Sequence, residues 1–158
     1  MASAYKYIKE SIRQNLKQKM IEWRRSESIV KLDKPSDIGK ARILGYKDKK
    51  GFVIARVRII RGGRKRSMKR KGRRSKRQTI RKTLKMNYRW VAEQRAARKF
   101  TNLEVLNSYM TGKDGQHYFF EIILIDPEKP EIQADKTISW ICKPENRGRV
   151  FKIGRAHV

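Results

Sequence analysis

The densest group of chemically active side chains lies between Arg61 and Lys82, where 13 of 22 positions are Lys or Arg. Lysine offers phosphate a point charge, and arginine offers a planar fork that grips two oxygens or stacks on a base. Glycines at 62, 63 and 72 permit sharp turns and close approach of the backbone to a ligand. The cations that we expect to bind phosphate in this stretch are Arg61, Arg64, Lys65, Arg66, Lys69, Arg70, Lys71, Arg73, Arg74, Lys76, Arg77, Arg81 and Lys82.

The whole chain carries the same sign of charge. Its 158 residues contain 42 Lys and Arg against 15 Asp and Glu, which gives a formal net charge of +27 and an isoelectric point near 10.8. An excess of this size opposes compaction by self-repulsion and attracts the chain to nucleic acid or to an acidic surface. A purely solvated charged face or a localisation signal explains so long and pure a basic run less well.

Further cations outside this stretch are candidates for nucleic-acid contact. Unpaired bases can also stack on aromatic side chains, and for Tyr46 the sequence leaves base stacking and core packing equally open. For the other aromatics that lie near cations, packing is the expected role. The additional candidate RNA-binding residues are Arg42, Tyr46, Lys47, Lys49, Lys50, Arg56, Arg58, Arg147 and Arg149.

The sequence offers no set of residues for catalysis. His117 and His157 are far apart, so they form neither a metal-ligand pair nor part of a nucleophile and base pair. Neither a GxxxxGK[ST] loop nor a GxGxxG turn occurs. We expect no enzyme activity, no cofactor and no metal. The single cysteine, Cys142, fits a reducing compartment, and we expect it to be a half-buried small hydrophobe.

Neither a membrane span nor a secretory leader is predicted. The sequence has no apolar run of the roughly 18 residues that a span requires, and MASAYKYIKE lacks the apolar centre of a signal peptide. We therefore expect a cytoplasmic protein with no membrane partner, and we do not expect a homo-oligomer.

Periodicity predicts the elements that must position these cations. Apolar residues spaced for one helical face predict an N-terminal helix over 4–24, and Tyr88 to Phe100 predicts another. Alternation after Gly51 predicts a strand with Val53, Ala55, Val57 and Ile59 on one face and Arg56 and Arg58 on the other. Residues 103–110 and 117–125 predict a hairpin in which Gly112 and Asp114-Gly115 supply positive φ.

The remaining segments predict a short helix opened by Pro35, Ser36 and Asp37, and an extended piece at 137–142. On the second hairpin strand, Tyr118, Phe120, Ile122 and Leu124 predict the core face, which leaves Glu121 on a face open to RNA. We expect one α+β domain over 1–158, with an antiparallel sheet packed with helices, an extended basic loop over 61–87 and a basic C-terminal tail over 143–158.

Several motifs occur in an order that resembles one known family, the large-subunit ribosomal protein fifteen of the archaeal and eukaryotic type. The matches are AYKYI at 4–8, ARILGYKDKKG at 41–51, RGGRKR at 61–66, KGRRSKR at 71–77, AEQRA at 92–96, LNSY at 106–109, EIILIDP at 121–127 and WI at 140–141. The KGRRSKR segment is closer to the archaeal branch. Relatives continue beyond the position of Phe151 with a longer tail rich in Gly, Ser, Lys and Arg, whereas this sequence reads FKIGRAHV.

The resemblance implies a structural protein of the large ribosomal subunit whose partners are ribosomal RNA and neighbouring ribosomal proteins. Two other functions fit the charge alone. A DNA-compacting basic protein would follow DNA, and an accessory factor for RNA modification would leave mature particles.

Overall fold

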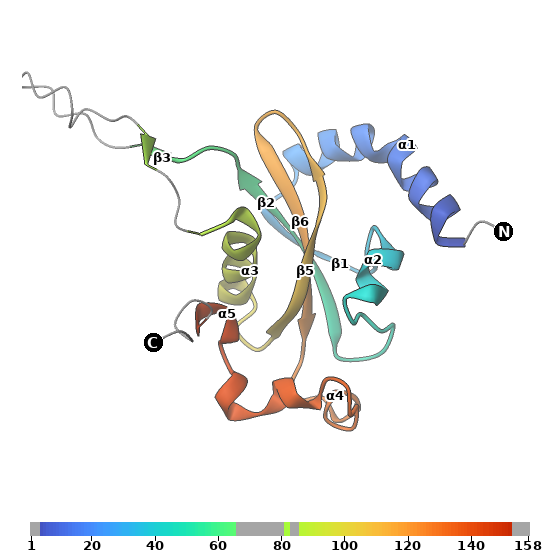
Figure 1. The fold of residues 1–158 in the computed structure, drawn as a ribbon, viewed down its shortest axis with the longest axis vertical. Coiled ribbons are helices and arrows are strands. Elements are labelled where there is room, and N and C mark those ends of the chain that lie inside the picture. The colour runs from blue at the N-terminus through green and yellow to red at the C-terminus, as the bar shows by residue number, and fades with distance from the viewer. Residues whose placement is uncertain (1–3, 66–80, 83–85, 153–158) are drawn as a thin grey trace, which may run out of the picture.

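A computed structural model describes residues 4–65, 81–82 and 86–152. At its centre lies a four-stranded antiparallel sheet with the strand order β1-β2-β6-β5 (Figure 1). Helices α1 and α2 lie on one side of this sheet, and α3 and α5 lie on the other. The α+β arrangement predicted from the sequence is therefore confirmed. The strands of the sheet are β1 (Ile29–Leu32), β2 (Phe52–Ile60), β5 (Glu104–Lys113) and β6 (His117–Ile125).

The helices begin at residues that can cap them. Asp37 accepts a hydrogen bond from the Lys40 N–H at the start of α2, and Asn87 accepts one from the Trp90 N–H at the start of α3. The predicted helices over 4–24 and 88–100 and the short helix after Pro35 are confirmed. The helices are α1 (Ala4–Arg25), α2 (Ile38–Ile43), α3 (Tyr88–Lys99), α4 (Pro130–Gln133) and α5 (Arg149–Lys152).

The α3 side of the sheet holds the larger apolar core. The alternating residues predicted to share a face do so, because Ala55, Val57, Ile122 and Leu124 are all buried in one cluster. Helix α3 contributes alanines, including Ala92, that are fully buried and let its backbone approach the strands. Burial of each large apolar side chain stabilises the fold by about 1.5 to 3 kcal/mol.

The opposite side of the sheet is also covered, so the prediction of a face open to RNA is wrong. Phe119, Glu121 and Ile123 of β6 are fully buried, beneath α1 and α2. The aromatic ring of Trp23 in α1 lies edge-on to Phe119, with the ring centroids 5.4 Å apart. A strand buried on both faces has a nearly continuous apolar sequence, and YFFEIILI is such a run.

The hairpin turn between β5 and β6 corrects a second prediction. Among the described residues, positive φ occurs only at Gly45, Gly51, Gly62 and Gly148, so neither Gly112 nor Asp114-Gly115 supplies it. Gly112 serves a different purpose: a Cβ there would lie 3.1 Å from Sδ of Met20. The glycine thus allows α1 to pack closely against the end of β5.

The C-terminal region is folded rather than extended. Residues 137–142, predicted as extended, include the 3-10 helix Ser139–Cys142, and a second one spans Pro144–Asn146. Val150 is 2% exposed within the main core, and its carbonyl accepts a hydrogen bond from Trp90 Nε1 at 2.7 Å. Residues 143–152 of the predicted basic tail are therefore folded against the body, and the last six residues of that tail lie outside the described ranges. Cys142 is a free, partly buried thiol, as predicted, and burial raises its pKa.

Candidate nucleic-acid interface

The basic segment between β2 and α3, residues 61–87, is here called the basic arm. Its two ends lie side by side because β3 (Arg64–Lys65) pairs antiparallel with β4 (Arg81–Lys82). Figure 1 shows β3 beyond the end of β2, on the side away from α2. Residues 64–65 and 81–82, which are far apart along the chain, therefore lie next to each other.

A tyrosine at the start of α3 joins the two ends of the arm. The Tyr88 hydroxyl accepts a hydrogen bond from the Gly62 N–H at 2.8 Å and donates to the Gly62 carbonyl at 3.3 Å. Gly62 has a φ of +101°, which other residues rarely adopt. The phenol also packs on the ring of Tyr118, with the centroids 4.8 Å apart. The first residues of the arm are thereby fixed to the last.

Arg61 attaches the arm to the sheet. Its N–H donates to the Gln116 carbonyl at 2.8 Å, which continues the strand ladder beyond β2. Its Nη1 donates to the Asp114 carbonyl at 2.7 Å, and its guanidinium lies 5.0 Å from the centroid of the Tyr118 ring. Arg61 is exposed but already bonded within the protein.

The carboxylate of Asp114 organises the same corner. It accepts hydrogen bonds from the N–H groups of Gln116 and His117, at 2.7 and 2.5 Å, and lies 3.5 Å from Nε of Arg24. Burial opposes ionisation, but these N–H donors and the nearby charges outweigh it, so the pKa of Asp114 lies below its ordinary value. The end of α1, the hairpin turn and the root of the arm are thus held together.

Two predicted RNA-binding arginines on β2 instead hold α1. Nη1 of Arg58 donates to the carbonyls of Trp23 and Arg24 at the C-terminal end of that helix, and Arg56 lies 4.7 Å above the Trp23 ring. Burial lowers the pKa of Arg56. These arginines do not lie on an open strand face, because α1, whose last carbonyls accept from Arg58, covers that surface. Their contact with RNA stays a prediction.

Other predicted residues also have protein partners. Lys47 and Lys49 each donate to the carboxylate of Asp135, at 2.5 and 2.8 Å, and these contacts place the pKa of that carboxylate far below its ordinary value. Arg149 donates to the Leu106 carbonyl at 3.4 Å, and its guanidinium lies 5.0 Å from the centroid of the Trp140 ring. These cations connect segments that are distant in the sequence.

Tyr46 is a packing residue rather than a stacking platform. It is 6% exposed, and its ring meets that of Phe52 edge-on, with centroids 5.7 Å apart. Burial is also the main reason why its pKa is raised. Conversely, two aromatics expected to pack are open to solvent, since Tyr7 is 63% exposed and Trp140 is 39% exposed.

The remaining predicted cations divide into three groups. Arg42, Lys50 and Arg147 are exposed and make no ion pair with any described residue. For Arg64, Lys65, Arg81 and Lys82 the structure describes the strand pairing but not the side chains. The others lie outside the described residues, and they are Arg66, Lys69, Arg70, Lys71, Arg73, Arg74, Lys76 and Arg77.

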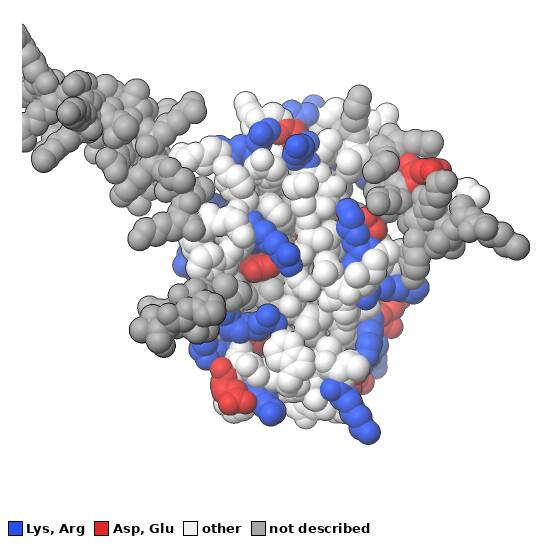
Figure 2. Space-filling view, in the orientation of Figure 1, with Lys and Arg blue, Asp and Glu red and all other residues white. Residues whose placement is uncertain are grey.

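On the face drawn in Figure 2, the described Lys and Arg residues are spread out, several of them beside Asp or Glu, rather than gathered in one patch. In the described ranges no group of His, Cys, Asp and Glu has a geometry that could hold a metal ion. No described helix is long and apolar enough to cross a membrane.

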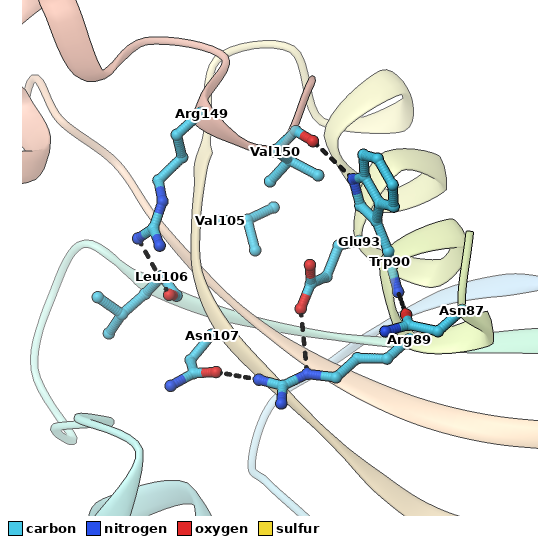
Figure 3. A pocket seen from close by; sticks show the side chains of 9 residues that line it. All are labelled: Asn87, Arg89, Trp90, Glu93, Val105, Leu106, Asn107, Arg149 and Val150. Atoms are coloured by element: carbon cyan, nitrogen blue, oxygen red, sulfur yellow. Dashed lines mark hydrogen bonds and ion pairs between the residues drawn. The ribbon is translucent and has the colours of Figure 1, made fainter. Parts of the chain in front are cut away.

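One cavity was not predicted from the sequence. It has a volume of about 260 Å³ and lies between α3, β5 and α5 (Figure 3). Only the Asn87 cap and the Arg89–Glu93 spacing on α3 are visible in the sequence as signals, because the other walls come from segments far along the chain. The lining residues are Asn87, Arg89, Trp90, Glu93, Val105, Leu106, Asn107, Arg149 and Val150.

Comparison with known protein families gives a match that spans nearly the whole chain. The family model described as Ribosomal L15, of the L15e type, matches residues 1–156.

Proposed function

The chain belongs to the ribosomal L15e family and is a structural protein of the large ribosomal subunit, and from that premise we propose that it binds folded ribosomal RNA by neutralising phosphate charge. The basic arm is the main contact in this proposal. Exposed cations on the body, Arg42, Lys50 and Arg147, add to it.

The charge of the arm supports this function. No Asp or Glu occurs from Lys49 to Ala92, so the arm contains no acid that could neutralise its own cations. In the complex, RNA phosphates neutralise the cations of the arm, and each phosphate contact releases condensed counterions from the RNA. Shape and backbone, rather than base sequence, are what such a segment recognises in RNA helices.

The fixed root of the arm is the observation that carries the proposal. The hydrogen bonds between Tyr88 and Gly62 and those from Arg61 to the hairpin turn hold both ends at one corner of the sheet. A loop whose ends are fixed loses less conformational entropy when it is ordered by a ligand than a free chain of the same length. The sheet therefore determines where the arm enters RNA.

The remaining parts of the proposal follow from the family. The protein acts in the cytoplasm as part of the ribosome, without catalysis, and neighbouring large-subunit proteins are its other partners. The assignment to the archaeal branch stays a prediction.

Binding to two polyanions tests the proposal. The full chain is titrated against a transcript of large-subunit ribosomal RNA and against duplex DNA of equal length at the same salt concentration. We expect tighter binding to the transcript, and we expect the protein to remain with large subunits through a high-salt wash. Equal affinity for both polyanions, together with release in the wash, would contradict a role as an integral subunit protein.

A further inference from the structure

The cavity between α3, β5 and α5 combines apolar walls with polar groups. Val105 and Val150 are nearly fully buried and form part of its lining. Figure 3 shows Arg89 along one side of the cavity and Arg149 on another, with Glu93 between α3 and β5. Ligand pockets for drug-sized molecules measure roughly 300 to 1,000 Å³, so a cavity of about 260 Å³ suits one planar ring system.

Protein contacts fix the orientation of both arginines. Nε of Arg89 donates to Ser108 Oγ at 2.8 Å and lies 3.3 Å from Oε1 of Glu93, while its Nη2 donates to Asn107 Oδ1. Arg149 is held by the Leu106 carbonyl and the Trp140 ring. Side chains fixed in this way lose little freedom when a ligand binds.

Glu93 determines which ligand fits. Its residue is only 8% exposed, and its Oε1 accepts hydrogen bonds from both Arg89 and Ser108. Its Oε2 has no hydrogen-bond partner among the described residues. Four buried side-chain N and O atoms of the described residues lack a partner, and Glu93 Oε2 is not one of them, so it is partly open to solvent. This oxygen is therefore an available acceptor at the cavity.

We propose that this cavity receives one unstacked base of ribosomal RNA, whose exocyclic amino group donates to Oε2 of Glu93. A phosphate fits less well, because the carboxylate repels it and already compensates the charge of Arg89. A base is planar and largely uncharged, and it presents N–H donors on an edge that unpaired RNA exposes. Cytosine, adenine and guanine carry the amino group, and uracil does not.

This inference rests on the proposed function, but the two can fail separately. Nucleosides carry no phosphate, so their binding reports on the cavity without the general attraction between the protein and RNA. Cytidine and uridine form a matched pair, because position 4 of the base carries an amino donor in cytidine and a carbonyl oxygen in uridine, while N3 is an acceptor in cytidine and a donor in uridine.

The test is a titration of the isotope-labelled full chain with each nucleoside, followed by nuclear magnetic resonance. We expect cytidine to produce saturable shifts in the Trp90 indole N–H and in the Arg89 and Asn107 amides. We expect uridine to bind about tenfold or more weakly, since at position 4 a carbonyl oxygen, which the carboxylate repels, replaces the amino donor. Equal binding of the two nucleosides, or the absence of saturable shifts at these signals, would overturn the proposal.

Two variants sharpen the test. Glu93→Gln places an amide near the base, so the preference for cytidine over uridine should disappear, while the exposed Glu131→Gln should keep it. In large subunits that contain Glu93→Gln, one nucleotide should gain reactivity toward a base-directed reagent while its neighbours stay protected. If Glu93→Gln does not fold, the comparison of cytidine and uridine on the unmodified chain still decides the matter. Normal binding to ribosomal RNA without any nucleoside preference would reject the cavity and leave the proposed function standing.

Discussion

The folded body and the basic arm contain the same cationic residue types but use them differently. In the body, Arg58, Lys47 and Arg89 each donate to a carbonyl or carboxylate of the protein itself. In the arm, between Arg61 and Asn87, the sequence contains no acid at all. A count of positive charge therefore does not identify the cations that meet RNA, because many of them stabilise the fold.

The largest expected effect concerns the apolar core that packs α3 against the sheet and so supports both the body and the root of the basic arm. Ile122→Ala removes methyl and methylene groups from a fully buried position next to α3, so it should lower the free energy of unfolding by about 2 to 5 kcal/mol. The matched control is Ile60→Ala, at a residue that is 70% exposed. Denaturant unfolding measures both variants. Similar losses for the two would mean that the register assigned to β2 and β6 is wrong.

The second prediction concerns the buried carboxylate on the α1 side of the sheet. Glu121 is fully buried, and its Oε2 accepts hydrogen bonds from the Ser36 N–H, at 3.0 Å, and from the Tyr109 hydroxyl. This environment raises the pKa of Tyr109, chiefly through burial and then through the charge of Glu121. Glu121→Gln replaces an acceptor by a donor or weakens both bonds, so it should cost about 1 to 3 kcal/mol of stability.

The matched control for that variant is Glu128→Gln, at an exposed residue. The sequence analysis placed Glu121 on an open face, where glutamine would be tolerated, whereas the buried hydrogen bonds predict a loss of stability. Thermal unfolding of the two variants at one pH tests the buried hydrogen bonds. An unchanged unfolding midpoint for Glu121→Gln would show that they contribute little to stability.

A smaller effect is expected at the end of α1. Arg58→Gln removes a cation that satisfies the last carbonyls of that helix, which should cost about 1 kcal/mol. Amide exchange should become faster in the last turn of α1 and remain unchanged in α3. The exposed Arg42→Gln is the control. If exchange in α1 did not change, Arg58 would be free to contact RNA and the division between body and arm would weaken.

The smallest effect concerns pH. The pKa of Asp135 is depressed in the folded chain by Lys47 and Lys49, so its ion pairs add stability at a pH above the ordinary aspartate pKa. This contribution is lost as the pH falls through the depressed folded value. At neutral pH, Asp135→Asn should therefore speed amide exchange in residues 129–139, and only strong acid should have the same effect on the unmodified chain. Loss of protection at mildly acidic pH would contradict this assignment.

Periodicity was sufficient to predict the long elements, because α1, α3, β2 and β6 have apolar residues repeated at helical or strand spacing. It missed β1, whose four residues form a strand by pairing with β2. It also predicted residues 137–142 as extended, whereas Ser139–Cys142 form a 3-10 helix. Ile138, which precedes this helix, and Ile141 within it are both buried in one core cluster. Short elements are determined by distant partners rather than by their own sequence.

The same limit applied to the candidate site. The arm was recognisable because charge density is a local property of the sequence. The internal partners of Arg58 and Glu121 could not be recognised in the sequence, because the bond from Arg58 spans 34 positions and the bond to Glu121 spans 85 positions. The cavity beside Glu93 likewise brings together three segments that only the fold places next to one another.

The most direct test of the division between body and arm is a salt titration with two matched double variants. Lys69→Gln with Lys71→Gln removes two lysines from the arm, and Lys47→Gln with Lys49→Gln removes two lysines that are paired with Asp135. Affinity for the large-subunit ribosomal RNA transcript is measured over a range of salt concentrations. Each duplex phosphate contact contributes roughly 0.9 to the slope of log affinity against log salt, so the arm variant should lose up to about two units of slope. The body variant should keep the slope of the unmodified chain. Equal losses in the two variants would show that all surface cations act alike, and would contradict the claim that the arm makes the phosphate contacts.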